Sequence, residues 1–282
     1  MKFVFISTMA YWPWGGSEEL WSQTALQLKQ AGHDVTALVA YWPKLSQRVS
    51  ALARQGIRIR PYPQPSNLAG SLRHSFDKIT LAWRRIFAWL VRSKPDLVVI
   101  SQGHNSGGFH WSRICQKAAI PYVIIVQCNS ENWWFEDTTF EEAAVSYAAA
   151  RKVFCVSHSN LDLLRRQVGK QLENGEVVWN PCNVAVEQIP AWPSTNGRWN
   201  LACVARLDPA AKGQDLLLEV MARPEWRDRP ADLHFFGEGR LFGLTLRRLA
   251  DRLQLNNVHF RGHVNDIKAI DLLHPGQKRP PS

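Results

Sequence analysis

The last third of the chain contains NLACVARLDPAAKGQDLLLEVMA at residues 200–222, and DLHFFGEGR follows at residues 232–240. The apolar run at the start of each segment predicts a strand, LDPAAKG predicts a turn into a helix, and EGR predicts a tight turn. Two cations, Arg206 and Lys212, lie beside this predicted helix start. An Arg fork and a Lys point charge can each contact phosphate oxygens, and free N–H groups at a helix start add partial positive charge. The stretch therefore predicts a site for a diphosphate.

Short apolar runs alternate with helical stretches along the rest of the chain. Between residues 2 and 180 the predicted strands are KFVFIS, DVTALVA, IRIRPY, DLVVIS, YVIIVQ, KVFCVS and EVVWN. Strands and helices that alternate in this way predict a parallel sheet with crossover helices. Several runs are apolar at consecutive positions, as in strands that are covered on both faces. We therefore expect an α/β fold with two Rossmann-like, doubly wound domains and ligands at the carboxyl ends of their strands.

The composition changes at AVEQIPAWPSTNGR, residues 185–198, where Pro, Ser, Asn and Gly interrupt the periodic pattern. The expected parts are a first domain, a linker, a second domain and a disordered tail, at residues 1–188, 189–198, 199–273 and 274–282. The second domain has three predicted strands, whereas an open doubly wound sheet usually has about five or six. We expect this domain to be incomplete, the chain to be C-terminally truncated, and apolar sheet surface to face water.

Two loops of the first domain follow predicted strands. The first, STMAYWPWGGSEE, lacks the GxGxxG pattern of dinucleotide-binding dehydrogenases and places Gly15 and Gly16 before a helix. Glycines there let a ligand approach backbone N–H groups, and the aromatic residues offer flat faces to a sugar or acyl surface. The second loop, QGHNSGG, places His104 at a strand end. His104 is a candidate for binding a sugar hydroxyl, and an ordinary loop position is the alternative.

Composition narrows the class of protein. The 282 residues are 45% hydrophobic and 21% charged, which is globular composition. No apolar run of about 20 residues and no signal peptide is apparent, so we expect a cytoplasmic protein. The five cysteines lie far apart without ligand-like spacing, so we expect neither a disulfide framework nor a metal site.

The net charge of +10 is concentrated in residues 41–95, where eleven Lys or Arg residues accompany Asp77 as the sole acid. Within this region residues 71–94 read as an amphipathic helix with basic residues beside its apolar stripe. Such a helix can lie on an anionic membrane surface, or it can pack one side on a sheet and leave a solvated basic side. Both interpretations stay open. Nucleic acid is disfavoured because no recognised reader motif accompanies the charge.

The order of VARLDPAAKGQDLLLEVM, FGEGR and VHFRGHV resembles the donor-binding half of glycosyltransferase family 4, and GGSE resembles the N-terminal loop of that family. The resemblance implies a GT-B fold and transfer of a sugar, with retention, from a nucleotide diphosphate sugar to an acceptor hydroxyl. It places the donor diphosphate on Arg206 and Lys212 beside Gly237, Glu238 and Gly239, and the base near His263 and Val264. Gly15 and Gly16 would lie near acceptor and phosphate, with His104 at the catalytic position.

One departure limits the resemblance. The paired glutamates of the family lie beyond the GHV segment, and this chain has no Glu after Glu238. A catalytically inactive remnant and a basic membrane-surface module therefore stand as alternatives to an active transferase. The resemblance implies no cofactor besides the nucleotide sugar donor. The acceptor stays open between a glycan and a lipid-linked molecule, with a peripheral place at the inner membrane face as a further expectation.

Overall fold

The computed structural model describes residues 1–9, 12–43, 45–63, 75–182, 197–239, 241–264 and 270, with side chains from residue 81 in the fourth range. The chain separates into two compact units, Met1–Pro181 and Cys182–Ser282, called unit 1 and unit 2 below. Most of the predicted linker, all of the predicted tail and the start of the basic helix lie outside the described residues.

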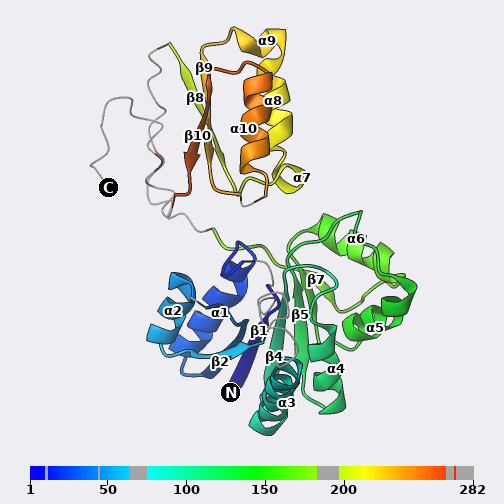
Figure 1. The fold of residues 1–282 in the computed structure, drawn as a ribbon. Helices are drawn as coiled ribbons and strands as arrows, with labels where there is room; N and C mark the ends of the chain where they lie inside the picture. The colour runs from blue at the N-terminus through cyan, green and yellow to red at the C-terminus, as the bar shows by residue number, and fades with distance from the viewer. Residues whose placement is uncertain are drawn as a thin grey trace. The chain divides into compact units, whose positions relative to one another are not determined.

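Unit 1 is built on a seven-stranded sheet in which every pair of neighbours is parallel. The strand order is β3-β2-β1-β4-β5-β6-β7 (Figure 1). The strands are β1 (Lys2–Ser7), β2 (Asp34–Ala40), β3 (Arg58–Tyr62), β4 (Leu97–Gln102), β5 (Tyr122–Val126), β6 (Val153–Cys155) and β7 (Gly175–Val177). The outward order on both sides of β1 is that of a doubly wound sheet, which confirms the predicted α/β fold.

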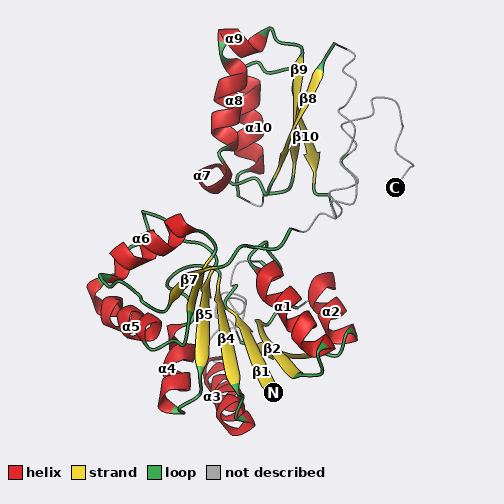
Figure 2. Cartoon of the chain, turned by 180° about the vertical axis from the view of Figure 1, so that it is seen from behind, coloured by secondary structure: helices red, strands yellow, loops and turns green. Residues whose placement is uncertain are grey.

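Helices cover both faces of this sheet (Figure 2). They are α1 (Glu18–Gln30), α2 (Gln47–Arg54), α3 (Ser75–Ser93), α4 (Phe109–Lys117), α5 (Asp137–Ala148) and α6 (His158–Val168). On one face Phe3 and Phe5 of β1 pack with Trp21 of α1 and Leu52 of α2. The other face packs Val4, Ile6 and Ile100 against side chains of α3 to α6. Because side chains alternate between the faces of a strand, one consecutive apolar run supplies both cores.

Unit 2 has a parallel sheet of three described strands in the order β10-β9-β8. Its elements are β8 (Trp199–Val204), α7 (Pro209–Lys212), α8 (Gln214–Ala222), α9 (Pro224–Arg227), β9 (Ala231–Phe236), α10 (Gly243–Arg252) and β10 (Val258–Gly262). Leu218, Leu233, Phe235 and Leu246 form its core between the sheet and helices α8 and α10.

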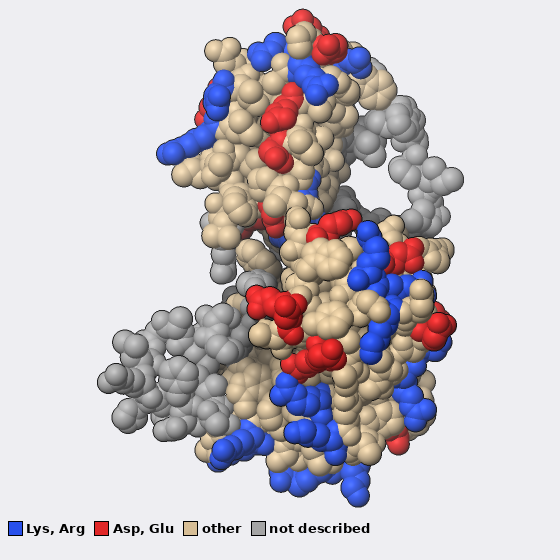
Figure 3. All heavy atoms as spheres, turned by 90° about the vertical axis from the view of Figure 1, so that its right-hand side faces the viewer, with Lys and Arg blue, Asp and Glu red and all other residues tan. Residues whose placement is uncertain are grey.

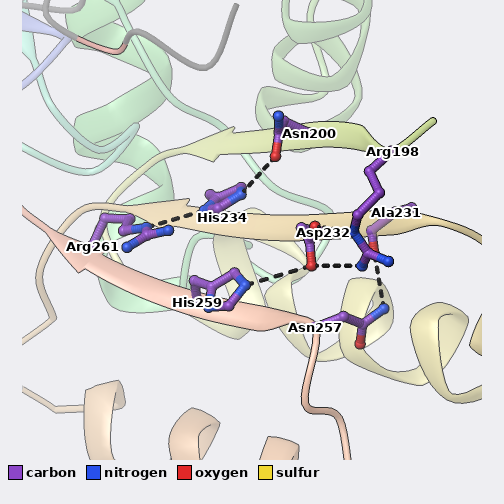
Figure 4. Close-up of polar contacts among 8 residues, drawn as sticks. All are labelled: Arg198, Asn200, Ala231, Asp232, His234, Asn257, His259 and Arg261. Carbon is purple, nitrogen blue, oxygen red and sulfur yellow. Dashed lines mark hydrogen bonds and ion pairs between the residues drawn. The ribbon is translucent and has the colours of Figure 1, made fainter. Parts of the chain in front are cut away.

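The opposite face of these three strands carries a polar network (Figure 4). Arg198 contacts Asp232 through Nε and Nη2, at 2.8 and 2.9 Å. Arg261 Nε donates to His234 Nδ1 at 3.0 Å, and the rings of His234 and His259 stack 4.8 Å apart. The expectation of an apolar sheet face is therefore wrong for β9 and β10, because polar residues alternate with the apolar ones along them, whereas Val204 of β8 is exposed on this face.

Candidate functional site

The carboxyl ends of β8, β9 and β10 form one edge of unit 2. Leu207 N donates to Glu238 O at 3.1 Å, which joins the segment after β8 to the segment after β9. Gly237 N donates to Gly262 O at 2.8 Å, which joins the segment after β9 to the end of β10. These bonds bring the predicted site residues to one edge, although they are spread over 59 positions of sequence: Arg206, Gly237, Glu238, Gly239, His263 and Val264.

Gly237 and Gly239 of the FGEGR turn lie so close to a neighbouring segment that neither position has room for a side chain. A Cβ at Gly237, whose φ is +152°, would lie 2.7 Å from the Ala205 carbonyl carbon. A Cβ at Gly239 would lie 2.7 Å from Leu207 Cβ. Real Cβ atoms essentially never come within 3.0 Å of another heavy atom, so side chains there would force the two segments apart. The glycines thus keep the turn against the backbone on either side of Arg206.

Arg206 lies on the surface and pairs with Asp208 at the start of α7. Its Nη2 is 3.0 Å from Asp208 Oδ2, and its Nε donates to the same oxygen at 3.1 Å. Asp208 also caps α7 by accepting from Ala211 N at 3.4 Å. An exposed ion pair of this kind contributes about 0–1 kcal/mol, so an anionic ligand can compete for the guanidinium at low cost.

Lys212 is the last residue of α7 and is exposed. The sequence predicted one helix start in this segment. The structure has two, because Gly213 adopts φ +63° and separates α7 from α8. Burial raises the pKa of the Cys203 thiol in β8, and the positive charge of Lys212 opposes that rise. Lys212 has no ion-pair partner in the part of unit 2 that the structure describes. Its ammonium group is therefore available to a ligand at this edge.

Gln214, which the sequence did not single out, holds the turn that carries Arg206. Its side chain is fully buried at the first residue of α8. Gln214 Nε2 donates to Arg206 O at 2.8 Å, and Asp208 N donates to Gln214 Oε1 at 3.2 Å. One amide thus binds the backbone on both sides of Leu207. The sequence signal is weak, because a Gln at a helix start is usually solvated.

The Gly15–Gly16 loop precedes α1 in unit 1. Gly15 O accepts from Glu18 N at 3.0 Å, and a Cβ at Gly16 would meet no atom within 4 Å. Glu18 is buried and its Oε2 accepts from Trp21 Nε1 at 2.9 Å. Burial raises the pKa of the Glu18 carboxyl, although hydrogen bonds from Ser7 and Trp21 oppose the rise. A pocket beside this loop is lined by Ser7, Met9, Trp12, Pro13, Glu18, Val39, Ala40, Trp42, Leu45, Ser46 and Val49.

His104 follows β4 and stacks on Trp133, with the ring centroids 4.0 Å apart. Its Nδ1 accepts from Ser106 N at 3.2 Å and lies 2.8 Å from Ser106 Oγ. Because a backbone N–H can only donate, Nδ1 is unprotonated and the ring proton lies on Nε2. Partial burial lowers the pKa of His104, which favours this neutral form. The ring therefore offers an Nε2–H donor.

A buried polar network holds the two loops that carry His104 and Trp133. Asn105 Nδ2 donates to Asn129 Oδ1 and to Trp133 O, both at 3.0 Å. Tyr147 donates its hydroxyl to Gln102 Oε1 at 2.9 Å. The described residues contain no group of three or more His, Cys, Asp and Glu side chains placed to hold a metal ion.

The basic region occupies α2, β3 and α3. In the part of α3 whose side chains are described, Trp83, Ile86, Phe87 and Leu90 pack into the core of unit 1. Basic side chains of the same helix remain exposed: Arg84, Arg85 and Arg92. Figure 3 shows Lys and Arg side chains gathered at the bottom of the view, in unit 1. Within the part described, no helix combines the length and the apolar character needed to span a membrane.

The profile of glycosyltransferase family 4 matches residues 14–186. The chain belongs to glycosyltransferase family 4. The predicted resemblance is thereby confirmed, and the family together with the fold indicates a glycosyltransferase. No curated protein sequence matches the chain significantly.

Solved structures of similar fold are GT-B glycosyltransferases. HepE of Anabaena in complex with UDP is 18% identical, with a TM-score of 0.67 over 95% of this chain and 70% of that one. The lipopolysaccharide outer core galactosyltransferase WaaB is 16% identical, with a TM-score of 0.60 over 94% and 69%. TarM of S. aureus is 12% identical, with a TM-score of 0.62 over 94% and 78%. At these identities the likeness is one of fold, and it confirms the predicted GT-B architecture.

Proposed function

We propose that the chain carries the donor-binding edge of a retaining glycosyltransferase, which transfers a sugar from a nucleotide diphosphate sugar to an acceptor hydroxyl. One observation carries the proposal: Arg206, the FGEGR turn and the segment after β10 meet at one edge of unit 2. Parallel α/β sheets bind ligands at this edge. The donor complexes of HepE contain UDP and UDP-glucose, so UDP-glucose is the first donor to test.

The cations would stabilise the departing diphosphate. At about 4 Å and an effective dielectric near 20, one cation–phosphate pair is worth about 4 kcal/mol before desolvation and ordering costs. A helix start adds about 0.3–1 kcal/mol. Arg206 and Lys212 therefore account for most of the attraction, and negative charge that develops on the leaving phosphate strengthens it. Val264 and His263, which follow β10, would contact the base.

Unit 1 would supply the acceptor side of the reaction. The Gly15–Gly16 loop leaves open space beside Gly16, so a ligand can approach the backbone there. The Nε2–H of His104 would donate to a sugar hydroxyl, because Ser106 fixes its tautomer and Trp133 fixes its plane. A glycan and a lipid-linked hydroxyl both fit this chemistry. The exposed basic side of α3 favours an acceptor at an anionic membrane surface.

The proposal is tested by incubating the protein with UDP-glucose and measuring UDP release, with and without glycerol as a model acceptor. An active transferase releases UDP faster with acceptor, and retention yields an α-glucoside, which NMR identifies. Binding of UDP-glucose without release supports the alternative of a catalytically inactive remnant. Absence of binding contradicts the proposed function.

A further inference from the structure

A row of buried polar side chains crosses unit 1 beneath the start of α1. Ser7 ends β1 and pairs in register with Ser101 of β4. Gln127 follows β5, and its N–H donates to Gln102 O at 3.1 Å, which extends the pairing of β4 with β5 by one residue. The exposed fractions of the three residues are 2% for Ser7, 1% for Ser101 and 8% for Gln127.

The side chains of this row lie on the face covered by α1. Val99 of β4 and Ile125 of β5 pack in the same core as Trp21 of α1. Because side chains alternate along a strand, Ser101 and Gln127 lie two residues further on that same face. They are neighbours on adjacent strands, at the carboxyl edge where the Gly15–Gly16 loop also lies.

Three polar atoms of this row have no hydrogen-bond partner among the described residues: Ser101 Oγ, Gln127 Oε1 and Gln127 Nε2. Gln102, one strand away, is satisfied in contrast, because its Nε2 donates to Gly107 O at 2.5 Å and its Oε1 accepts from Tyr147. An unpaired buried polar group destabilises the folded state, so folding alone would favour Leu at position 127. Such a residue is expected where a ligand completes the bonds.

Met9 lies beside one end of this row, because its N–H donates to Ser7 Oγ at 3.2 Å. A Cβ at Gly15 would be 3.1 Å from Met9 Cε, and a Cβ at Gly103 would be 3.7 Å from the same atom. Met9 also lines the pocket that contains Ser7 and Glu18. Its unbranched side chain adapts to different surroundings, so Met9 can move to admit a ligand beside Ser7.

The donors and acceptors of the row select a class of ligand. The Gln127 amide offers two N–H donors and a carbonyl acceptor, and the Ser101 hydroxyl both donates and accepts. Neighbouring hydroxyl groups complement this set, because each of them also donates and accepts. A phosphate would leave the carbonyl unpaired, and Glu18, hydrogen-bonded to Ser7, is a poor neighbour for an anion. An apolar chain would leave all three atoms unpaired.

We propose that Gln127 and Ser101 bind adjacent hydroxyl groups of a neutral polyol, as the specificity subsite for the acceptor. The identification of this polyol as an acceptor rests on the proposed function, whereas the binding of a polyol does not. The subsite would make the enzyme prefer an acceptor whose reacting end is a sugar or another polyhydroxyl group.

The test combines binding and stability in Gln127→Leu, with Gln102→Leu as the matched control. Saturation-transfer NMR with D-glucose as probe should detect binding to the wild type that inorganic phosphate does not displace. Gln127→Leu should weaken this binding at least tenfold while its urea unfolding midpoint stays unchanged or rises. Gln102→Leu should lower the midpoint, because it removes satisfied bonds. Ser101→Ala should weaken D-glucose binding to a smaller extent.

Three results would overturn the subsite: no D-glucose binding by the wild type, unchanged binding by Gln127→Leu, or a fall in its midpoint like that of Gln102→Leu. The last result would mean that the amide supports the fold. UDP titration of Gln127→Leu separates this proposal from the previous one, because the variant should bind UDP like the wild type. If the variant loses polyol binding and keeps UDP binding, the result supports the polyol subsite at Gln127 and leaves the donor site unaffected.

Discussion

Gly237 and Gly239 show how a single atom decides the geometry of the proposed donor edge. Both face the backbone of the segment that carries Arg206, and a Cβ at either position would come within 3.0 Å of it. Gly16 differs, because a Cβ there would enter open space and its φ is not positive. The same residue type therefore has a structural role in unit 2 and leaves room beside a loop in unit 1.

Gly237→Ala should destabilise unit 2 by at least about 2 kcal/mol, since the strained φ and the overlap with Ala205 add together. Urea unfolding measures the loss. The control Gly16→Ala should change the free energy of unfolding by less than about 0.5 kcal/mol. Equal effects of the two substitutions would mean that the turn does not lie against the Arg206 segment.

Residue type and order alone single out Arg206, Lys212 and the glycine turn as a candidate phosphate site, and this assignment stays a prediction. The sequence could not predict Gln214, whose two bonds to backbone exist only once the α7 turn has folded. It could predict His104 as a candidate, but it could not predict which of the two ring nitrogens carries the proton. That nitrogen is fixed by Ser106, and the ring plane by Trp133 from a loop 29 residues away.

At the scale of elements, consecutive apolar residues predicted β1, β2, β4 and β5, because a strand covered on both faces must be apolar throughout. The outer strand β3 differs, since its sequence RIRPY includes exposed Arg side chains. The sheet of unit 2 was less predictable. Its strands alternate, and Asp232, His234, His259 and Arg261 place a polar network on one face. A run as short as VHFR contains too few residues for the alternation to be recognised in the sequence. The polar face becomes apparent only when the strands are aligned in the sheet.

This network makes unit 2 sensitive to acid. His234 is held neutral, because Arg261 donates to its Nδ1 and its Nε2–H then donates to Asn200 Oδ1 at 3.2 Å. Burial lowers the pKa of His234 to about 4, and the positive charges of Arg261 and His259 add to the effect. The unfolded chain, with a His pKa near about 6.5, therefore binds more protons than the folded one between these values.

The stability of unit 2 should consequently fall as the pH decreases from about 6.5 toward 4. His234→Gln should flatten this dependence, since Gln does not titrate, whereas the exposed His263→Gln should leave it unchanged. Urea unfolding in a pH series measures both. His110 of unit 1, whose pKa burial also lowers to about 4, should keep its own contribution in both variants. An unaltered slope in His234→Gln would show that this ring is not the sensor.

Helix α3 should bind anionic vesicles mainly through its charge, because most of its described apolar side chains pack in the core, although Leu81 and Val91 are exposed. Flotation with phosphatidylserine vesicles should show binding at low salt that disappears near about 0.5 M salt, where screening is strong. Reversing Arg84, Arg85 and Arg92 to Glu should abolish it. Reversing the exposed residues Lys117, Arg151 and Lys170 is the matched control and should have a smaller effect. Binding that resists salt, or no binding at low salt, would contradict this expectation.

At the scale of the whole molecule, the chain consists of two compact units with separate cores. Composition and alternation could predict two α/β units, because each needs its own periodic pattern. The donor, its base and the acceptor could not be predicted, since they depend on loop contacts such as those of Trp133 and Gln127. The family and fold fix the class of enzyme, and the three aligned strand ends of unit 2 suggest where its donor binds.

Calorimetric titration of UDP into the wild type and into the double variant Arg206→Ala, Lys212→Ala tests this donor edge most directly. We expect one UDP per chain and at least tenfold weaker binding by the double variant. Its unfolding midpoint should be unchanged, because both side chains are exposed. Equal UDP affinity of the two proteins, or no binding by the wild type, would contradict the account.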